Sequence, residues 1–254
     1  MTDLQIRAKQ AISLLDFTNL NDNCSNADIE ALSRRGQTEF GTVAALCVFP
    51  QFIKIAQREL GSPSIKIATV TNFPDGSADA ARAQKETAEA FALGADEVDV
   101  VIAYRAILAN DVKAAAAIVA AAAKEKPRRK ILKVILETGE LKTDEAIRTA
   151  CKIALDNGAN FLKTSTGKVA VNATLHSARL LLDEIKKSGR KVGFKAAGGI
   201  KTANDAAAYL DLADEIMGKG WAVPATFRFG ASSVLDDLLA VAAGQASTAK
   251  ASGY

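Results

Sequence analysis

Two lysines lie inside short apolar runs of this sequence, a position that lysine rarely occupies. Lys163 belongs to the run FLKTSTGK (residues 161–168), and Lys195 belongs to VGFKAAGG (residues 192–199). Each run has the composition of a buried strand that ends in a glycine-containing turn. Burial disfavours the charged form of an amine, and a second cation nearby lowers the pKa of a lysine further. Such a lysine is a nucleophile, so the pair predicts the chemistry of a Schiff-base enzyme.

The elements that must position these lysines alternate between strand and helix. Eight apolar, β-rich runs are separated by amphipathic stretches of helical period, which favours a parallel sheet. Eight such units in about 230 residues predict an α/β fold, a closed (β/α)8 TIM barrel, rather than an open doubly wound sheet. The expected strands are 14–20, 44–49, 65–71, 97–102, 131–138, 160–165, 191–196 and 226–231; the expected helices include 77–93, 105–125, 143–156, 175–187 and 202–212.

The whole chain, residues 1–254, is expected to form a single TIM-barrel domain. An extra N-terminal helix is predicted at about residues 3–12, before the first strand. The segment 244–254 is rich in glycine, serine, alanine and threonine, and we expect a flexible C-terminal tail there. No GxGxxG motif follows the first predicted strand, which argues against a dinucleotide-binding fold.

The alternation of side chains along the strands sorts them between the barrel interior and the helix layer. On this basis charged side chains from five strands point inward: Asp16, Asp99, Lys133, Lys163 and Lys195. Carboxylates and lysines that converge in a barrel mouth indicate a reaction centre. The alternative is a set of buried ion pairs that fixes strand register without a catalytic role.

Small residues and one lysine follow the last three predicted strands. Glycines let backbone N–H groups approach an anion closely, and two serines where the last helix begins add a helix N-terminus. TIM barrels often bind phosphate in this quarter of the barrel mouth. The pattern predicts a phosphate site made by Gly167, Lys168, Gly198, Gly199, Ser232 and Ser233. The simpler alternative for each glycine is that it only makes a turn.

Composition argues against several other classes of function. The formal net charge is +3 and the basic residues are spread along the chain, so no nucleic-acid partner is expected. No apolar stretch approaches the roughly 18–20 residues of a membrane helix, and no signal peptide is expected, which favours a cytoplasmic protein without a membrane partner. The cysteines, at positions 24, 47 and 151, suggest no disulfide framework or zinc site. The single histidine, His176, argues against a histidine metal site and a Ser-His-Asp triad.

The motifs resemble the deoxyribose-phosphate aldolase family of class I aldolases over nearly the whole chain. The FLKTSTG run is highly specific, and further matching segments are 16–20, 68–74, 94–101, 132–139 and 193–199. The resemblance implies an aldehyde-lyase with a TIM barrel that needs no metal or other cofactor. It also implies the reaction, which is reversible cleavage of 2-deoxy-D-ribose 5-phosphate to D-glyceraldehyde 3-phosphate and acetaldehyde in deoxyribonucleotide catabolism. The expected partners are therefore small-molecule phosphosugars and aldehydes.

The resemblance implies roles for individual residues as well. Lys163 is the Schiff-base lysine, Lys195 is the neighbour that lowers its pKa, and Asp99 is the carboxylate of a proton relay. The substrate and phosphate pocket of the family matches Asp16, Thr18, Cys47, Thr166, Gly167, Lys168, Gly198, Gly199, Ser232, Ser233 and Tyr254. Tyr254 would reach the site on the flexible tail. For Cys47 the simpler explanation, a small residue of the apolar core, is favoured.

One turn departs from the family pattern, because Ala196 and Ala197 follow Lys195 where many members carry a serine or proline. Both alanines are small, so phosphate access should survive. Two other functions stay open on the sequence. One is another Schiff-base aldolase of the transaldolase or keto-acid type, and the other is a non-catalytic barrel that binds a phosphosugar. The sequence is compatible with a monomer or a homodimer.

Overall fold

Eight parallel strands close into a barrel, so the predicted (β/α)8 fold is confirmed. The structure, a computed structural model, describes residues 1–60 and 64–247. Around the barrel the strands follow one another in chain order, and β10 pairs with β1 to close it. Their bounds are β1 Leu15–Asn19, β4 Ala45–Val48, β5 Lys66–Thr71, β6 Glu97–Val101, β7 Ile131–Ile135, β8 Phe161–Lys163, β9 Gly193–Ala197 and β10 Phe227–Ala231. A separate two-stranded sheet is formed by β2 (Gln37–Thr38) and β3 (Gly41–Thr42).

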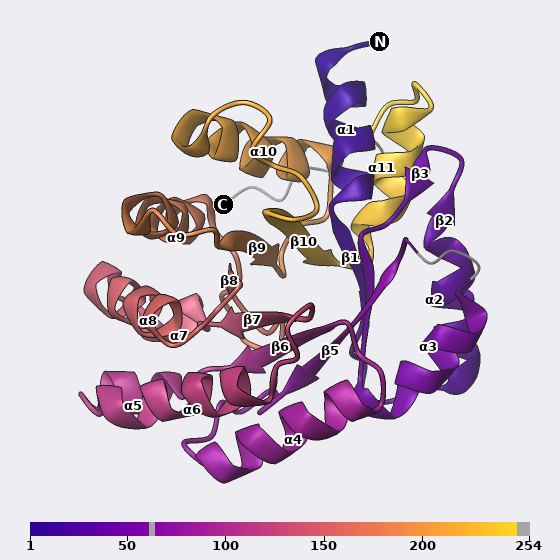
Figure 1. Cartoon of the computed structure of the whole chain (residues 1–254). Helices are drawn as coiled ribbons and strands as arrows, with labels where there is room; N and C mark the ends of the chain where they lie inside the picture. The colour runs from indigo at the N-terminus through magenta and orange to yellow at the C-terminus, as the bar shows by residue number, and fades with distance from the viewer. Residues whose placement is uncertain (61–63, 248–254) are drawn as a thin grey trace.

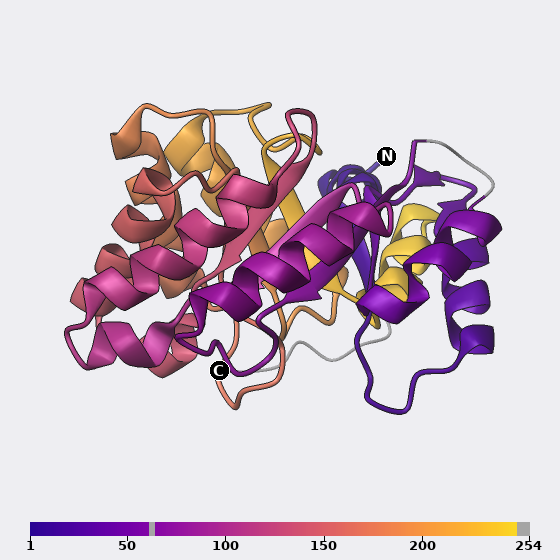
Figure 2. The ribbon, with the colours of Figure 1, turned by 60° about the horizontal axis from the view of Figure 1, so that its bottom comes forward.

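Helices surround the barrel as an outer layer (Figures 1 and 2). Many begin at a side chain that caps their first backbone N–H groups, as Thr174 does for α9 and Thr202 for α10. The helices are α1 Asp3–Ser13, α2 Asn26–Arg35, α3 Ile53–Glu59, α4 Ala80–Ala92, α5 Tyr104–Leu108, α6 Val112–Glu125, α7 Thr138–Leu141, α8 Asp144–Asp156, α9 Leu175–Ser188, α10 Ala203–Met217 and α11 Val234–Ala242, with a 3₁₀ turn η1 at Pro50–Phe52. In the described part of the chain, no helix has the length and apolar character needed to cross a membrane.

Left-handed residues interrupt two of the predicted elements. The strand expected at 131–138 ends at Ile135, because Glu137 turns the chain with a left-handed backbone (φ +57°) and α7 follows. The helix expected at 105–125 is two helices, α5 and α6, separated at Asn110, which is also left-handed (φ +60°). A left-handed residue cannot continue a regular helix or strand, so each one marks an end.

The predicted N-terminal helix is confirmed as α1, which lies alongside α10 and α11 in the outer layer (Figure 1). Arg7 of α1 reaches Asp211 and Asp214 of α10, at 2.6 Å in each case. Of the predicted tail, residues 244–247 are described, and the Ser247 hydroxyl donates to the Asp237 carboxylate. The helix and this contact attach both ends of the described chain to the outer helix layer.

The apolar core has two parts, separated by the sheet. Side chains that face outward, such as Leu46, Val98 and Phe194, are buried between strands and helices. Inside the barrel, β4 and β5 contribute a small apolar cluster that includes Cys47 and Val70. The other strands contribute charged side chains to the interior, together with the ring of Phe161. The fold therefore places its charges in the centre of the barrel and its main apolar core around it.

Gly193 makes room for an aromatic ring inside the barrel. It pairs with Phe161 in the β8–β9 register, and a Cβ atom on Gly193 would lie 2.4 Å from Cε1 of that ring. Real Cβ atoms essentially never lie this close to another non-bonded heavy atom. The absence of a side chain at Gly193 therefore provides the space that the Phe161 ring occupies.

We predict that Gly193→Ala lowers the free energy of unfolding by about 1–3 kcal/mol through overpacking, measured by thermal or denaturant unfolding. The matched control is Gly189→Ala, at a helix end with φ +64° and no atom within 4 Å, where only backbone strain of about 1 kcal/mol is expected. Equal or smaller loss at Gly193 would show that the Phe161 ring moves aside freely.

Candidate active site

The strand register brings the two predicted lysines together. Lys163 on β8 and Lys195 on β9 are direct partners in the parallel pairing, so both side chains leave the sheet on the same face. Both are buried, with Lys163 3% exposed and Lys195 fully enclosed. Lys133 on β7 pairs in the same way with Asp99 on β6. Four inward positions are thus fixed by backbone pairing alone.

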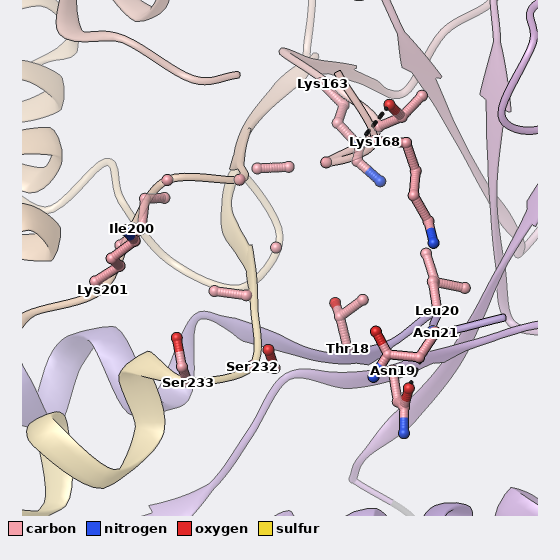
Figure 3. A pocket seen from close by; sticks show the side chains of 17 residues that line it. Thr18, Asn19, Leu20, Asn21, Lys163, Lys168, Ile200, Lys201, Ser232 and Ser233 are labelled. Carbon is pink, nitrogen blue, oxygen red and sulfur yellow. Dashed lines mark hydrogen bonds between the residues drawn. The ribbon is translucent and has the colours of Figure 1, made fainter. Parts of the chain in front are cut away.

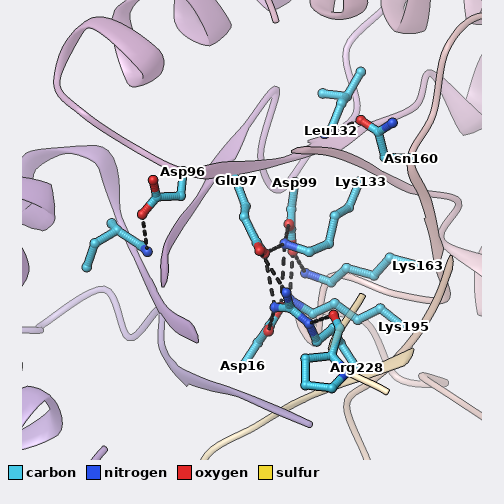
Figure 4. A network of polar contacts seen from close by, with 12 residues as sticks. Asp16, Asp96, Glu97, Asp99, Leu132, Lys133, Asn160, Lys163, Lys195 and Arg228 are labelled. Carbon is cyan, nitrogen blue, oxygen red and sulfur yellow. Dashed lines mark hydrogen bonds and ion pairs between the residues drawn. The ribbon is translucent and has the colours of Figure 1, made fainter. Parts of the chain in front are cut away.

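Asp99 is the centre of the resulting network (Figure 4). Its Oδ2 atom accepts hydrogen bonds from Lys163 Nζ at 2.9 Å and from Lys195 Nζ at 2.8 Å. Its Oδ1 atom accepts from Lys133 Nζ at 2.8 Å. One buried carboxylate therefore joins three lysine side chains from three successive strands, which is a geometry that the sequence did not specify.

A second carboxylate, Asp16, binds the other side of Lys195. Its Oδ2 atom lies 2.5 Å from Lys195 Nζ, and its Oδ1 atom lies 2.5 Å from Arg228 Nη1. Lys195 is thereby held between two carboxylates, whereas Lys163 has only one. This difference distinguishes the two lysines electrostatically.

Glu97 and Arg228 complete the network, and the sequence analysis missed both. Glu97 contacts Lys133 Nζ at 2.5 Å and receives two hydrogen bonds from the Arg228 guanidinium. Glu97 has the same strand parity as Asp99, so alternation could have placed it inside. Arg228 is flanked by Phe227 and Phe229 on β10, the same pattern of a cation in an apolar run that marked the lysines.

The charges in this cluster balance only when one base is neutral. Four basic groups (Lys133, Lys163, Lys195 and Arg228) face three carboxylates (Asp16, Glu97 and Asp99). An uncompensated charge in such a buried site is costly, so the loss of one proton from a base is favoured. The basic group with the fewest carboxylate contacts in the set is Lys163.

The pKa shifts agree with this count. Burial lowers the pKa of Lys163, and Lys195 lowers it further, against the opposing effect of Asp99. Burial also opposes the charge on Lys195, but Asp16 and Asp99 outweigh it and raise the pKa of that lysine. Burial would raise the pKa of Asp99, yet the lysines Lys133, Lys163 and Lys195 hold it well below its usual range. The site thus holds an amine of lowered pKa beside a lysine of raised pKa and a carboxylate of lowered pKa, which is the electrostatic arrangement that favours a nucleophilic amine.

A cavity of about 260 Å³ opens above Lys163 at the carboxyl ends of the strands. Lys163 and Lys168 project into it from one side, while Thr18, Ser232 and Ser233 lie across from them (Figure 3). The volume suits a small molecule. Most residues predicted for the pocket line this cavity: Thr18, Thr166, Gly167, Lys168, Gly198, Gly199, Ser232 and Ser233.

The far end of the cavity has the features of an anion site. Gly167, Gly198 and Gly199 all have a positive φ, near +80°, which exposes backbone groups without side chains. A side chain on Gly198 would also collide with Asn172, 2.7 Å away. Ser233 immediately precedes α11, so the N-terminus of that helix faces the same end. Lys168 adds a positive charge, which an ion pair with exposed Asp22 at 3.3 Å partly offsets.

Other predicted residues occupy different places. Asp16 is buried below the cavity, where it holds Lys195. Cys47 belongs to the apolar cluster inside the barrel, and burial raises the pKa of its thiol. Tyr254 lies outside the described residues. The cavity also has Asn21 and Lys201 in its wall, which the sequence analysis did not name.

Metal ligands are not grouped in the part of the chain that the structure describes: no three His, Cys, Asp or Glu side chains are arranged to hold an ion. His176 lies on the surface, where its ring pairs with Asp144. The carboxylates of the central network are instead occupied by lysine and arginine.

Comparison with known proteins agrees with this geometry. The family model for DeoC/LacD family aldolases matches residues 10–240. The chain belongs to this aldolase family. It is 52% identical over 248 residues to the deoxyribose-phosphate aldolase of Agrobacterium fabrum (strain C58 / ATCC 33970), covering 97% of this chain and 96% of that protein.

Solved structures of this aldolase family share the fold. An apo structure from Toxoplasma gondii ME49, provisionally classed as a deoxyribose-phosphate aldolase, superposes with a TM-score of 0.87 at 25% identity, over 95% of this chain and 98% of that one. The deoxyribose phosphate aldolase of Aeropyrum pernix superposes with a TM-score of 0.71 at 22% identity, over 94% of this chain and 97% of that one. At this identity the similarity establishes a shared fold and nothing more.

We predict that Lys195→Leu shifts the reactivity of Lys163 to higher pH and slows its reaction with acetaldehyde on the order of 10²-fold at neutral pH. Only neutral Lys163 is a nucleophile, so its rate rises as pH rises through its pKa. Removing Lys195 deletes a charge that lowers this pKa and leaves Asp16 and Asp99 short of a cation. The measurement is the pH profile of imine formation. The control is Lys187→Leu, the same substitution at an exposed position, which should leave the pH profile unchanged. An unchanged profile in Lys195→Leu would show that the charge of Lys195 has no role.

Proposed function

We propose that this protein is a class I aldolase that reversibly cleaves 2-deoxy-D-ribose 5-phosphate to D-glyceraldehyde 3-phosphate and acetaldehyde through a Schiff base on Lys163. The observation that carries the proposal is the placement of Lys163. It is a buried lysine with a lowered pKa, at the floor of a cavity whose far end is suited to a phosphate. The relative from Agrobacterium fabrum, at 52% identity, supports the choice of substrate.

The reaction begins when neutral Lys163 attacks the C1 aldehyde of the substrate; the carbinolamine that forms loses water to give an imine, which takes up one proton from the surrounding acid groups or water. The resulting iminium ion withdraws electrons from the C2–C3 bond. As that bond breaks, its electron pair forms an enamine on Lys163, and the C3 hydroxyl gives up its proton to become the aldehyde of glyceraldehyde 3-phosphate. Protonation of the enamine at C2 and hydrolysis then release acetaldehyde and restore the amine.

Asp99 and Lys195 supply the proton handling in this scheme. Asp99 is the carboxylate bonded to Lys163 Nζ, at 2.9 Å, so it is placed to accept a proton near the new imine, directly or through water. Lys195 shares the same Asp99 oxygen and remains charged, which keeps Lys163 in its neutral form. We therefore assign the proton relay to Asp99 and the electrostatic role to Lys195.

The anion end supplies positioning. A phosphate bound by Gly167, Gly198, Gly199 and Ser233 holds the sugar by an atom that does not react, and such fixation converts binding free energy into a favourable geometry at C1. We infer as well that residues 1–254 form one domain, since the barrel strands extend from Leu15 to Ala231 without a second closed sheet in the described chain.

We predict that borohydride added with 2-deoxyribose 5-phosphate traps a covalent adduct on Lys163, located by peptide mass mapping, and that Lys163→Ala abolishes both trapping and turnover. The matched control is Lys168→Ala, which removes a neighbouring lysine of the same cavity and should keep the adduct. An adduct on Lys195 would reverse the assigned roles. Phosphosugar binding without any adduct would favour the non-catalytic alternative.

We predict that Ser233→Asp weakens the use of phosphorylated substrate selectively, because a carboxylate at the start of α11 repels a phosphate. The expected change is roughly a tenfold or greater rise in KM for 2-deoxyribose 5-phosphate, with little change for unphosphorylated 2-deoxyribose. Steady-state kinetics on the two substrates measure it. Equal losses on both would contradict an anion site at Ser233.

A further inference from the structure

A buried glutamate that has no part in the central network lies beside the proposed active site. Glu137 follows β7, is fully enclosed and has a left-handed backbone (φ +57°, ψ +56°). Non-glycine residues in this conformation are uncommon, and they concentrate where a site needs them. The turn carries the Glu137 side chain from the end of β7 toward the loop that follows β8.

Both carboxylate oxygens of Glu137 bind one residue of that loop. Oε1 accepts the backbone N–H of Thr166 at 3.1 Å, and Oε2 accepts its hydroxyl at 2.6 Å. Thr166 is 7% exposed and lines the cavity. The carboxylate therefore fixes both the backbone and the side chain of a residue that faces the substrate.

The hydrogen-bonding capacity of the Thr166 hydroxyl shows what remains for a ligand. A hydroxyl can donate once and accept twice. Its proton is committed to Glu137, and its oxygen already accepts the backbone N–H of Lys168 at 3.0 Å. A single acceptor position is left. Toward the cavity, Thr166 can only accept a hydrogen bond.

We propose that Glu137 is a positioning residue that sets the polarity of the Thr166 hydroxyl, so that the site selects a substrate carrying a hydroxyl donor between its reacting carbon and its phosphate. Thr166 follows Lys163 and precedes Gly167 in the chain, and all three residues line the cavity. In the proposed reaction that donor is the C4 hydroxyl of the sugar, which is the C2 hydroxyl of glyceraldehyde 3-phosphate. The inference rests on the proposed function.

The variant Glu137→Gln tests whether Glu137 makes the Thr166 hydroxyl an acceptor toward the cavity, and it changes the shape of the side chain little. The amide can keep accepting the Thr166 N–H through its oxygen, but its NH₂ group donates where Oε2 accepted. The Thr166 hydroxyl then receives two donors, and its own proton turns toward the cavity. A donor replaces the acceptor in the cavity wall.

The measurement is kcat/KM for addition of acetaldehyde to glyceraldehyde 3-phosphate and to its 2-deoxy-2-fluoro analogue. Fluorine has the place of the hydroxyl but cannot donate. The unaltered protein should prefer the hydroxyl, and Glu137→Gln should reduce this preference roughly tenfold, the value of one hydrogen bond. The electronic effect of fluorine on the aldehyde is common to both proteins and cancels in the comparison.

Glu140→Gln is the matched control, since it makes the same chemical change three residues along the chain at a partly exposed position. It should keep the preference. If Glu137→Gln lowers both rates equally, or leaves their ratio unchanged, the proposal is overturned.

Thr166 provides a second test that does not depend on Glu137→Gln folding. Thr166→Ser, which keeps a hydroxyl, should retain the preference, whereas Thr166→Val should lose it, and adding Glu137→Gln to Thr166→Val should change the ratio no further. Loss of the preference in Thr166→Ser, or an additive effect in the double variant, would overturn the proposal. Borohydride trapping of acetaldehyde on Lys163 in the unaltered protein tests the proposed function separately, and the absence of an adduct there would reject that function and not this inference.

Discussion

The bonding of one carboxylate to three lysines is the interaction on which the rest of this structure depends. Asp99 joins Lys133, Lys163 and Lys195, which come from three successive strands and have no other way to share one anion. All four side chains are buried, so none of these charges can be satisfied by bulk water. The closure of the barrel brings the strands to the spacing that this bonding requires.

Such a centre is a poor way to gain stability and a good way to tune reactivity. Removing charges from water costs free energy that their mutual attraction only partly restores, and apolar side chains would fill the same space at least as well. The fold is stabilised instead by the apolar layer between the strands and the helices. The carboxylates are shared unequally between the two lysines: Lys195 lies between two of them, whereas Lys163 is bonded to one. Burial opposes the charge on both lysines. It lowers the pKa of Lys163, whereas at Lys195 the two carboxylates outweigh it and raise the pKa.

The site combines rigid and loop-borne parts. The amines and carboxylates extend from strands, whose positions are fixed by pairing on both sides. The anion end is built from the loops after β8, β9 and β10, where glycine backbones with positive φ leave space for a ligand. Glu137 links the two parts, because it extends from the end of β7 and fixes Thr166 in the loop after β8. A substrate held at one end by the loops is thereby presented to an amine held by the strands.

The sequence by itself determined the barrel, the inward direction of five charged side chains, and the residues at the carboxyl ends of the last three strands. These follow from local patterns: alternation along a strand, helical period, and glycines after strands. The sequence did not reveal that Glu97 and Arg228 belong to the network, although their parity was available, because a pattern gives direction and not distance. The strand predicted at 131–138 ran too far, through Glu137. The left-handed turn that ends it involves contacts with Thr166, 29 residues away, which local pattern does not reveal. Only the tertiary structure decided which lysine has its pKa lowered and which has it raised, because that depends on how many carboxylates reach each amine, and those carboxylates come from strands distant in the chain.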